Sequence, residues 1–204
     1  MLLTILTSTI LYIATAVDLL VLLIIYFSKA QTKQHRRQIY IGQYIGSLTL
    51  ITISLFFAYV LHFVPEKWLL GLLGLIPIYL GIKVAIFGDE DEEEAMEKLD
   101  KYGLSKLAKT VALITIASCG ADNLGLFIPY FISLNFIELA VTLVIFIILI
   151  YIMVKVAEKI NQISGIGEMI ETYSRWIMAI IYIGLGIYIL LENHTFQTLW
   201  AMLT

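Results

Sequence analysis

The sequence predicts an all-α integral membrane protein whose six transmembrane helices form two inverted three-helix repeats, with both chain ends outside the cell. Of its 204 residues, 60% are hydrophobic and only 14% are charged, whereas soluble domains carry about 25% charged residues. The apolar residues gather in six long runs. One run in each half of the chain carries an aspartate near its centre, Asp18 in the first half and Asp122 in the second.

Each run has close to the length of about 20 apolar residues that a helix needs to cross a bilayer. The predicted spans are residues 3–27, 39–61, 68–87, 110–132, 136–155 and 173–192. The chain is thereby divided into a first three-helix repeat, a cytoplasmic acidic linker and a second three-helix repeat, at 1–87, 88–109 and 110–204. No basic segment precedes the first run, which contains Asp18, so we expect a retained helix rather than a cleaved signal peptide.

The basic residues predict the orientation. Of the 13 Lys and Arg, all except Lys67 lie in or beside the connections that follow the first, third and fifth spans. Basic connections stay in the cytoplasm, so both termini are expected outside. The linker also holds a run of acids from Asp89 to Glu94. This run fits either a collector of divalent cations or a solvated helical linker, the usual role of charge blocks.

An internal repeat relates the two halves. A displacement of 104 residues places Asp18 on Asp122, and one of 105 residues places Leu80-Gly81-Ile82 on Leu185-Gly186-Ile187. Since each half has three predicted spans, the second half enters the membrane from the opposite side. Transporters built from inverted repeats bind their substrates at the repeat interface, near the bilayer midplane.

The two aspartates indicate what is bound there. An acid at mid-membrane costs about 3 kcal/mol on insertion scales and usually serves a function. The glycines and the proline around Asp122 predict a bent or partly unwound helix, a feature that transporters use at ion sites. If the two acids converge, protons or a dication must neutralise them, because no Lys or Arg lies near the span centres.

Neighbouring polar residues complete the predicted site. Thr15 shares a helix face with Asp18, and Thr115, Cys119, Asp122 and Asn123 share another face at helical spacing. Oxygen ligands suit manganese and similar ions, and a thiolate adds affinity for cadmium. The predicted metal ligands are Asp18, Asp122, Asn123, Cys119, Thr15 and Gln43. For Cys119 a packing role is the alternative, and for Gln43 a hydrogen bond to a neighbouring helix; the flanking Gly42 and Gly46 predict close helix packing.

These residues resemble the CadD-type cadmium resistance transporters of the LysE superfamily. The resemblance covers nearly the whole chain and rests on Thr15–Leu22, Gly42–Gly46, Cys119–Gly125 and Ile128–Phe131. It implies a multi-pass exporter of the bacterial plasma membrane that confers cadmium resistance, with zinc or manganese handled by some relatives. It also supports ligand roles for Asp18, Asp122 and Asn123, since related manganese exporters carry acids on the first and fourth helices.

The energetics predict an exchange mechanism. The sequence has no Walker A pattern for ATP hydrolysis, and we expect neither enzymatic activity nor a resident cofactor. Export of a dication against an inside-negative potential costs about 4.6 kcal/mol per 100 mV, so we expect antiport against protons by alternating access. The alternatives are an amino-acid or small-solute exporter of the same superfamily and an intramembrane aspartyl protease, whose Gly-x-Gly-Asp motif is missing here. A homodimer remains open.

Overall fold

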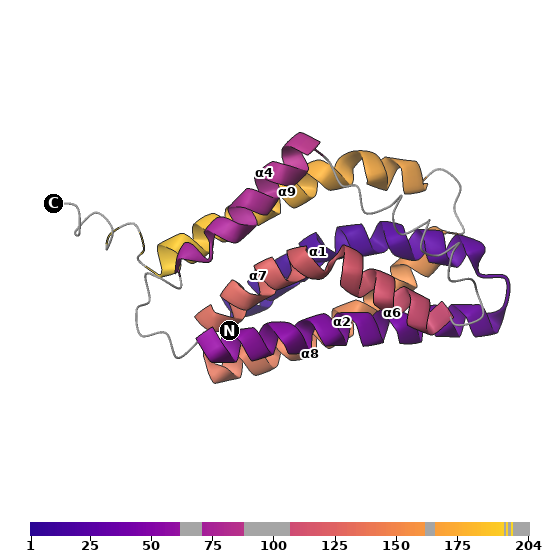
Figure 1. Ribbon diagram of the computed structural model, residues 1–204, viewed down its shortest axis with the longest axis horizontal. Coiled ribbons are helices and arrows are strands. Elements are labelled where there is room, and N and C mark those ends of the chain that lie inside the picture. The colour runs from indigo at the N-terminus through magenta and orange to yellow at the C-terminus, as the bar shows by residue number, and fades with distance from the viewer. Residues whose placement is uncertain (62–70, 88–106, 162–165, 194, 196, 198–204) are drawn as a thin grey trace.

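The computed structural model describes residues 1–61, 71–87, 107–161 and 166–193, together with 195 and 197, and every regular element among them is a helix (Figure 1). The helices are α1 (Leu2–Lys29), α2 (Lys33–Leu61), α4 (Leu75–Phe87), α6 (Leu107–Ser118), α7 (Gly120–Ser133), α8 (Phe136–Ile160) and α9 (Ile166–Glu192). The predicted all-α class is therefore confirmed for the described residues. The linker prediction falls mostly on residues outside them.

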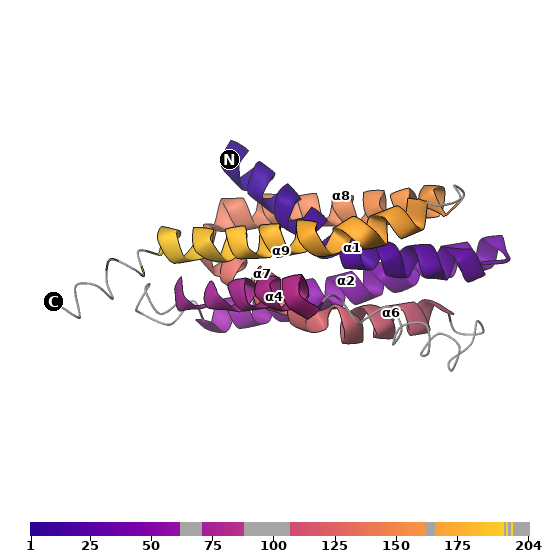
Figure 2. The ribbon, with the colours of Figure 1, turned by 90° about the horizontal axis from the view of Figure 1, so that it is seen from above.

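The helices run along the long axis of the molecule (Figures 1 and 2). The chain passes along this axis in alternating directions through α1, α2, α4, the α6–α7 pair, α8 and α9, and α9 ends at the same end of the bundle as α1 begins (Figure 1). By length and composition, two described helices can cross a membrane, α2 and α8, or up to four if each of two bent helix pairs forms one span. The helices support a membrane protein, whereas the six spans and their orientation stay predictions.

Two of the helical paths are bent. α1 turns by 51° between Leu2–Ala16 and Leu19–Lys29, and α6 meets α7 at 65°. The second bend confirms the prediction of a bent helix around Gly120. It lies at Cys119, between the two helices, whereas Pro129 lies well inside α7. The break thus coincides with the cysteine and Gly120 rather than with the proline.

Packing fixes both bent paths against straight helices. α1 packs along α8, and α6 and α7 both pack on α2. Gly42 and Gly46 make the second contact possible: a Cβ on Gly42 would lie 2.5 Å from the carbonyl oxygen of Ala108, and one on Gly46 would lie 2.9 Å from Cβ of Thr115. The close packing predicted from these two glycines is confirmed.

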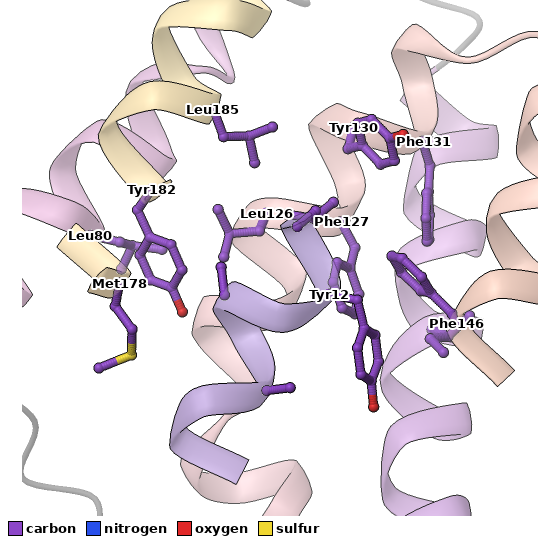
Figure 3. Close-up of a cluster of buried hydrophobic side chains, with 14 of the residues drawn as sticks. Tyr12, Leu80, Leu126, Phe127, Tyr130, Phe131, Phe146, Met178, Tyr182 and Leu185 are labelled. Atoms are coloured by element: carbon purple, nitrogen blue, oxygen red, sulfur yellow. The ribbon is translucent and has the colours of Figure 1, made fainter. Parts of the chain in front are cut away.

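A layer of aromatic rings joins α1, α7 and α8 (Figure 3). The ring of Phe146 lies at centroid distances of 5.3 Å from Tyr12, 5.0 Å from Phe127 and 5.9 Å from Phe131. All four side chains are buried. We call these four residues the aromatic layer; it fills the bundle between the α1 bend and the end at which α1 begins.

The α4–α9 pair lies along one flank of the bundle (Figure 1) and is packed backbone to backbone. A Cβ on Gly186 would meet the carbonyl oxygen of Gly74 and the backbone and side chain of Ile78. On the other helix, a Cβ on Gly81 would lie 2.9 Å from the carbonyl oxygen of Ala179 and 2.8 Å from Cγ1 of Ile183. Small residues are what allow such approach in membrane helices.

The glycine contacts predict opposite effects for two neighbouring substitutions in α9. Gly186→Ala places a methyl group against the α4 backbone, so it should lower the free energy of unfolding by about 1 to 3 kcal/mol, as overpacking does. Gly184→Ala adds a methyl group where no atom lies within 4 Å, so it should leave stability unchanged or raise it by up to about 1 kcal/mol through helix propensity. Thermal unfolding of both variants in one detergent measures the difference, and equal losses would contradict the packing described.

Candidate metal site

The break between α6 and α7 leaves backbone oxygens outside the helical hydrogen-bond ladder. Two bonds bridge it: the Cys119 amide donates to the Thr115 carbonyl at 3.1 Å, and the Asn123 amide donates to the Cys119 carbonyl at 3.0 Å. The backbone bonds that would continue the ladder across the break, from the amides of 120–122 to the carbonyls of 116–118, are not among those that the described residues form there. These oxygens lie at the negative end of the α6 dipole, the arrangement with which broken transporter helices coordinate cations.

A side chain of α7, that of Asn123, stabilises the break. This side chain is buried, and Nδ2 donates a hydrogen bond of 2.7 Å to the carbonyl oxygen of Cys119. The amide nitrogen is thereby committed to the backbone. No hydrogen-bond donor in the described part of the chain contacts Oδ1 of Asn123, so this oxygen remains available as a ligand.

A small cavity opens beside Asn123. Its volume is about 10 Å³, the scale of a single water molecule. The lining side chains come from α1, α2 and α7, namely Tyr12, Leu19, Ser47, Leu50, Ile51, Asn123 and Phe127. Leu19 and Asn123 directly follow Asp18 and Asp122 in the sequence. The cavity therefore lies where both bent helical paths meet α2.

A buried polar chain reaches this cavity from α6. The Thr115 hydroxyl donates to Oε1 of Gln43 at 3.0 Å, and Nε2 of Gln43 donates to the Ser47 hydroxyl at 2.9 Å. Ser47 lines the cavity. Of the two roles considered for Gln43, the bond to a neighbouring helix is present, because its amide oxygen accepts from Thr115; the role as a metal ligand stays a prediction. The residue positions Ser47 and α6.

The other predicted ligands do not form a group of side chains in the described part of the structure. Thr15 is buried, and its hydroxyl donates to the Tyr12 carbonyl within α1 at 3.1 Å. Asp122 lies half-buried in the first turn of α7, and the side chain of Asp18 lies outside the described residues. No three His, Cys, Asp or Glu side chains among those described are grouped to hold a metal ion. Convergence of the two acids stays a prediction.

The bend also separates residues that the helical spacing placed on one face. Asp122 shares a face of α7 with Gly125, whose Cβ would meet Ile76 and Leu80 of α4. Asn123 instead borders the cavity formed with α2. Because Thr115 belongs to α6, which is turned by 65° from α7, the single face expected for a continuous helix does not exist.

Two buried hydroxyl groups near the break were not among the predicted ligands. The hydroxyl oxygens of Tyr26 and Ser118 have no hydrogen-bond partner in the described structure, although the residues are only 1% and 8% exposed. Ser118 precedes Cys119, and Tyr26 belongs to the same buried cluster as Cys119. Residue type and spacing carry no signal for a missing partner, so only the structure could show it.

Polar contacts close the bundle at the end where α1 begins. The Ser8 hydroxyl lies 2.9 Å from the Tyr130 hydroxyl and 2.8 Å from that of Thr142, and all three residues are buried. Nearer the end, the Thr4 hydroxyl donates to Glu138 at 3.1 Å. α1, α7 and α8 are joined here, beyond the aromatic layer.

At the opposite end, a carboxylate joins α2 and α8. Glu158 of α8 accepts a hydrogen bond of 2.7 Å from the Tyr40 hydroxyl and forms ion pairs of 3.3 Å with Arg36 and Lys155. Arg36 and Tyr40 belong to α2. Polar contacts thus join the helices toward both ends of the bundle.

A family model described as cadmium resistance transporter matches residues 12–202 of the chain. No curated protein and no solved structure matches the chain. The matched segment includes both bends, the cavity and the glycine-packed α4–α9 pair. The protein therefore belongs to the cadmium resistance transporter family.

Proposed function

We propose that this transporter exports divalent heavy-metal cations, cadmium foremost and zinc or manganese as further substrates, across the bacterial plasma membrane in exchange for protons. One observation carries the proposal. The broken α6–α7 path leaves three carbonyl oxygens out of the helical ladder, and Asn123, in the first turn after the break, lines a water-sized cavity. Such a break is tolerated at membrane depth only where something satisfies the opened backbone, and a cation does so.

The charge balance supports a cation. The sequence has no Lys or Arg before Lys29 or between Lys109 and Lys155, so each bent path carries an acid and no basic residue of its own. The two carboxylates, with the oxygen of Asn123 and the sulfur of Cys119, supply the negative charge and the mixed ligands for a thiophilic dication. Thr15 and Gln43 act by holding the surrounding backbone and side chains rather than as direct ligands.

The packing supports two inverted repeats, 1–87 and 110–204, joined by 88–109. At a displacement of 105 residues, Gly81 corresponds to Gly186, Ile78 to Ile183 and the position of Gly74 to that of Ala179. The contacts of Gly186 with residues 74 and 78 are therefore repeated by those of Gly81 with residues 179 and 183. Likewise α1 on α8 corresponds to α6–α7 on α2.

The closures at both ends support alternating access. Hydroxyl groups and the aromatic layer join the helices toward one end, and the Glu158 contacts join α2 and α8 toward the other. Opening one closure at a time would expose the ion to one side only. From the basic connections, the Glu158 end is cytoplasmic. Protons taken up by Asp18 and Asp122 after metal release would neutralise the two carboxylates while the empty carrier returns.

The cavity volume favours an ion over an amino acid. An amino acid would need several times the space of about 10 Å³ found between the bends. A proteolytic role has no support from the described residues beyond the presence of aspartates. Export of a bare or partly dehydrated cation is the function that fits.

Asp122→Asn should abolish cadmium resistance and transport while the protein still folds, because the amide keeps the size of the side chain but neither its charge nor its proton. Growth of a sensitive bacterial host on cadmium and uptake of cadmium by everted vesicles measure the effect. The matched control is Glu138→Gln, an equal change at the helix end, which should retain transport. A fully active Asp122→Asn variant would refute the assigned role.

Coupling to protons is tested in the same everted vesicles. An acidic lumen should accelerate cadmium uptake several-fold, because protons then leave as the metal enters, and collapse of the pH gradient with a protonophore should remove that gain. Vesicles carrying Asp122→Asn give the background. Equal uptake rates with an acidic and with an alkaline lumen would contradict proton antiport, but they would not contradict metal export itself.

A further inference from the structure

One residue of α2 borders both the α6–α7 break and the cavity. Leu50 lines the cavity, and a Cβ built on Gly120 would lie 3.7 Å from Cδ2 of Leu50, an ordinary van der Waals distance. The residue is 2% exposed. It follows Ser47 by three positions, so both side chains lie on the same face of α2. Leu50 therefore lies beside the start of α7 and beside the cavity at the same time.

Most of the cavity wall is hydrocarbon. Four of the seven lining side chains carry no polar atom, namely those of Leu19, Leu50, Ile51 and Phe127. Each of these residues is at most 5% exposed. A buried water molecule needs two to four polar partners. With a volume of about 10 Å³, the cavity admits about one water molecule, and its apolar wall offers no partner to a second.

The size and polarity of the cavity set how much water a bound cation can keep. Magnesium dehydrates reluctantly, demands octahedral geometry and usually keeps several waters in protein sites. Zinc is satisfied by four protein ligands, and thiophilic cations gain from sulfur ligands in place of water. A site that holds about one water molecule therefore favours the second kind of cation over magnesium.

We propose that Leu50 is a specificity-determining residue, which excludes magnesium by filling the space that the waters retained by this ion would need. This inference rests on the proposed function, because it takes the transported cation to bind beside the break. Leu50 is not a ligand. Its role is to keep water from the oxygen ligands, since the hydrophobic shell around a metal site controls the access of solvent to it.

Leu50→Ala tests this by removing three carbon atoms from the wall. The widened cavity still borders the polar groups of Ser47 and Asn123, so water can enter it. Magnesium should then compete with cadmium at a concentration about tenfold lower than in the wild type. Calorimetry of cadmium binding to the full-length protein in detergent, repeated at rising magnesium concentrations, measures the effect. A merely structural role would weaken the binding of both ions alike and leave the ratio of their affinities unchanged.

Leu23→Ala is the matched control. Leu23 is as buried as Leu50, at 1% exposed, but is not among the residues that line the cavity. Its truncation should lower heat stability as Leu50→Ala does, and it should leave the ratio of cadmium to magnesium affinity unchanged. Leu50→Met keeps most of the apolar volume, so it should retain the wild-type ratio. Leu50→Val, which removes one carbon atom, should shift the ratio in the same direction as Leu50→Ala but by less.

The outcomes separate this inference from the function on which it rests. An unchanged ratio in Leu50→Ala, or in Leu50→Val where only that variant folds, would overturn the assignment, as would an equal shift in Leu23→Ala. Wild-type protein that binds magnesium as tightly as cadmium would overturn the exclusion of magnesium but not the export of cadmium. Wild-type protein that binds no cadmium would overturn the proposed function as well.

Discussion

The structure depends on how the opened backbone at Cys119 is accommodated within apolar surroundings. A helix that breaks there exposes carbonyl groups that hydrocarbon cannot satisfy, at several kcal/mol each. The Cys119 carbonyl accepts from both the amide and Nδ2 of Asn123, at 3.0 and 2.7 Å. The carbonyls of residues 116–118 remain outside the ladder. Under the proposed function these carbonyls would supply oxygens to the cation, so stability and binding would depend on the same backbone groups.

The surrounding contacts keep the break from closing into a straight helix. Gly46 allows α2 to contact Thr115 directly, and Gln43 then holds the Thr115 hydroxyl at 3.0 Å. On the other side, Phe127 packs into the aromatic layer and fixes the direction of α7. A continuous helix would have to give up one of these two contacts. The bend of 65° is therefore a consequence of two packing surfaces that face different neighbours.

The sequence predicted the helices, the break and the packing role of Gly42 and Gly46, because hydrophobic run length and glycine spacing are local properties. It predicted the ligand face less well. The spacing from Thr115 to Asn123 assumes one straight helix, whereas α6 and α7 meet at 65°, so Thr115 lies on a different helix from Asp122 and Asn123. Tyr26 was overlooked for another reason: a tyrosine in an apolar run resembles any core aromatic. Whether its hydroxyl finds a partner depends on tertiary contacts that no pattern along the chain encodes.

The two kinds of contact between helices imply how the proposed alternation would work. α4 and α9 contact each other through glycines and backbone atoms. If the two helices moved apart by the width of one methyl group, both would lose van der Waals packing, and no other group would replace it. The end closures are hydrogen bonds and ion pairs, which water can replace when an end opens; Glu158, with Arg36 and Tyr40, is the clearest case. Motion would therefore leave α4 and α9 together as the axis. α1 with α8, and α6–α7 with α2, would tilt about it as two units, and the bends between them would open to one side at a time.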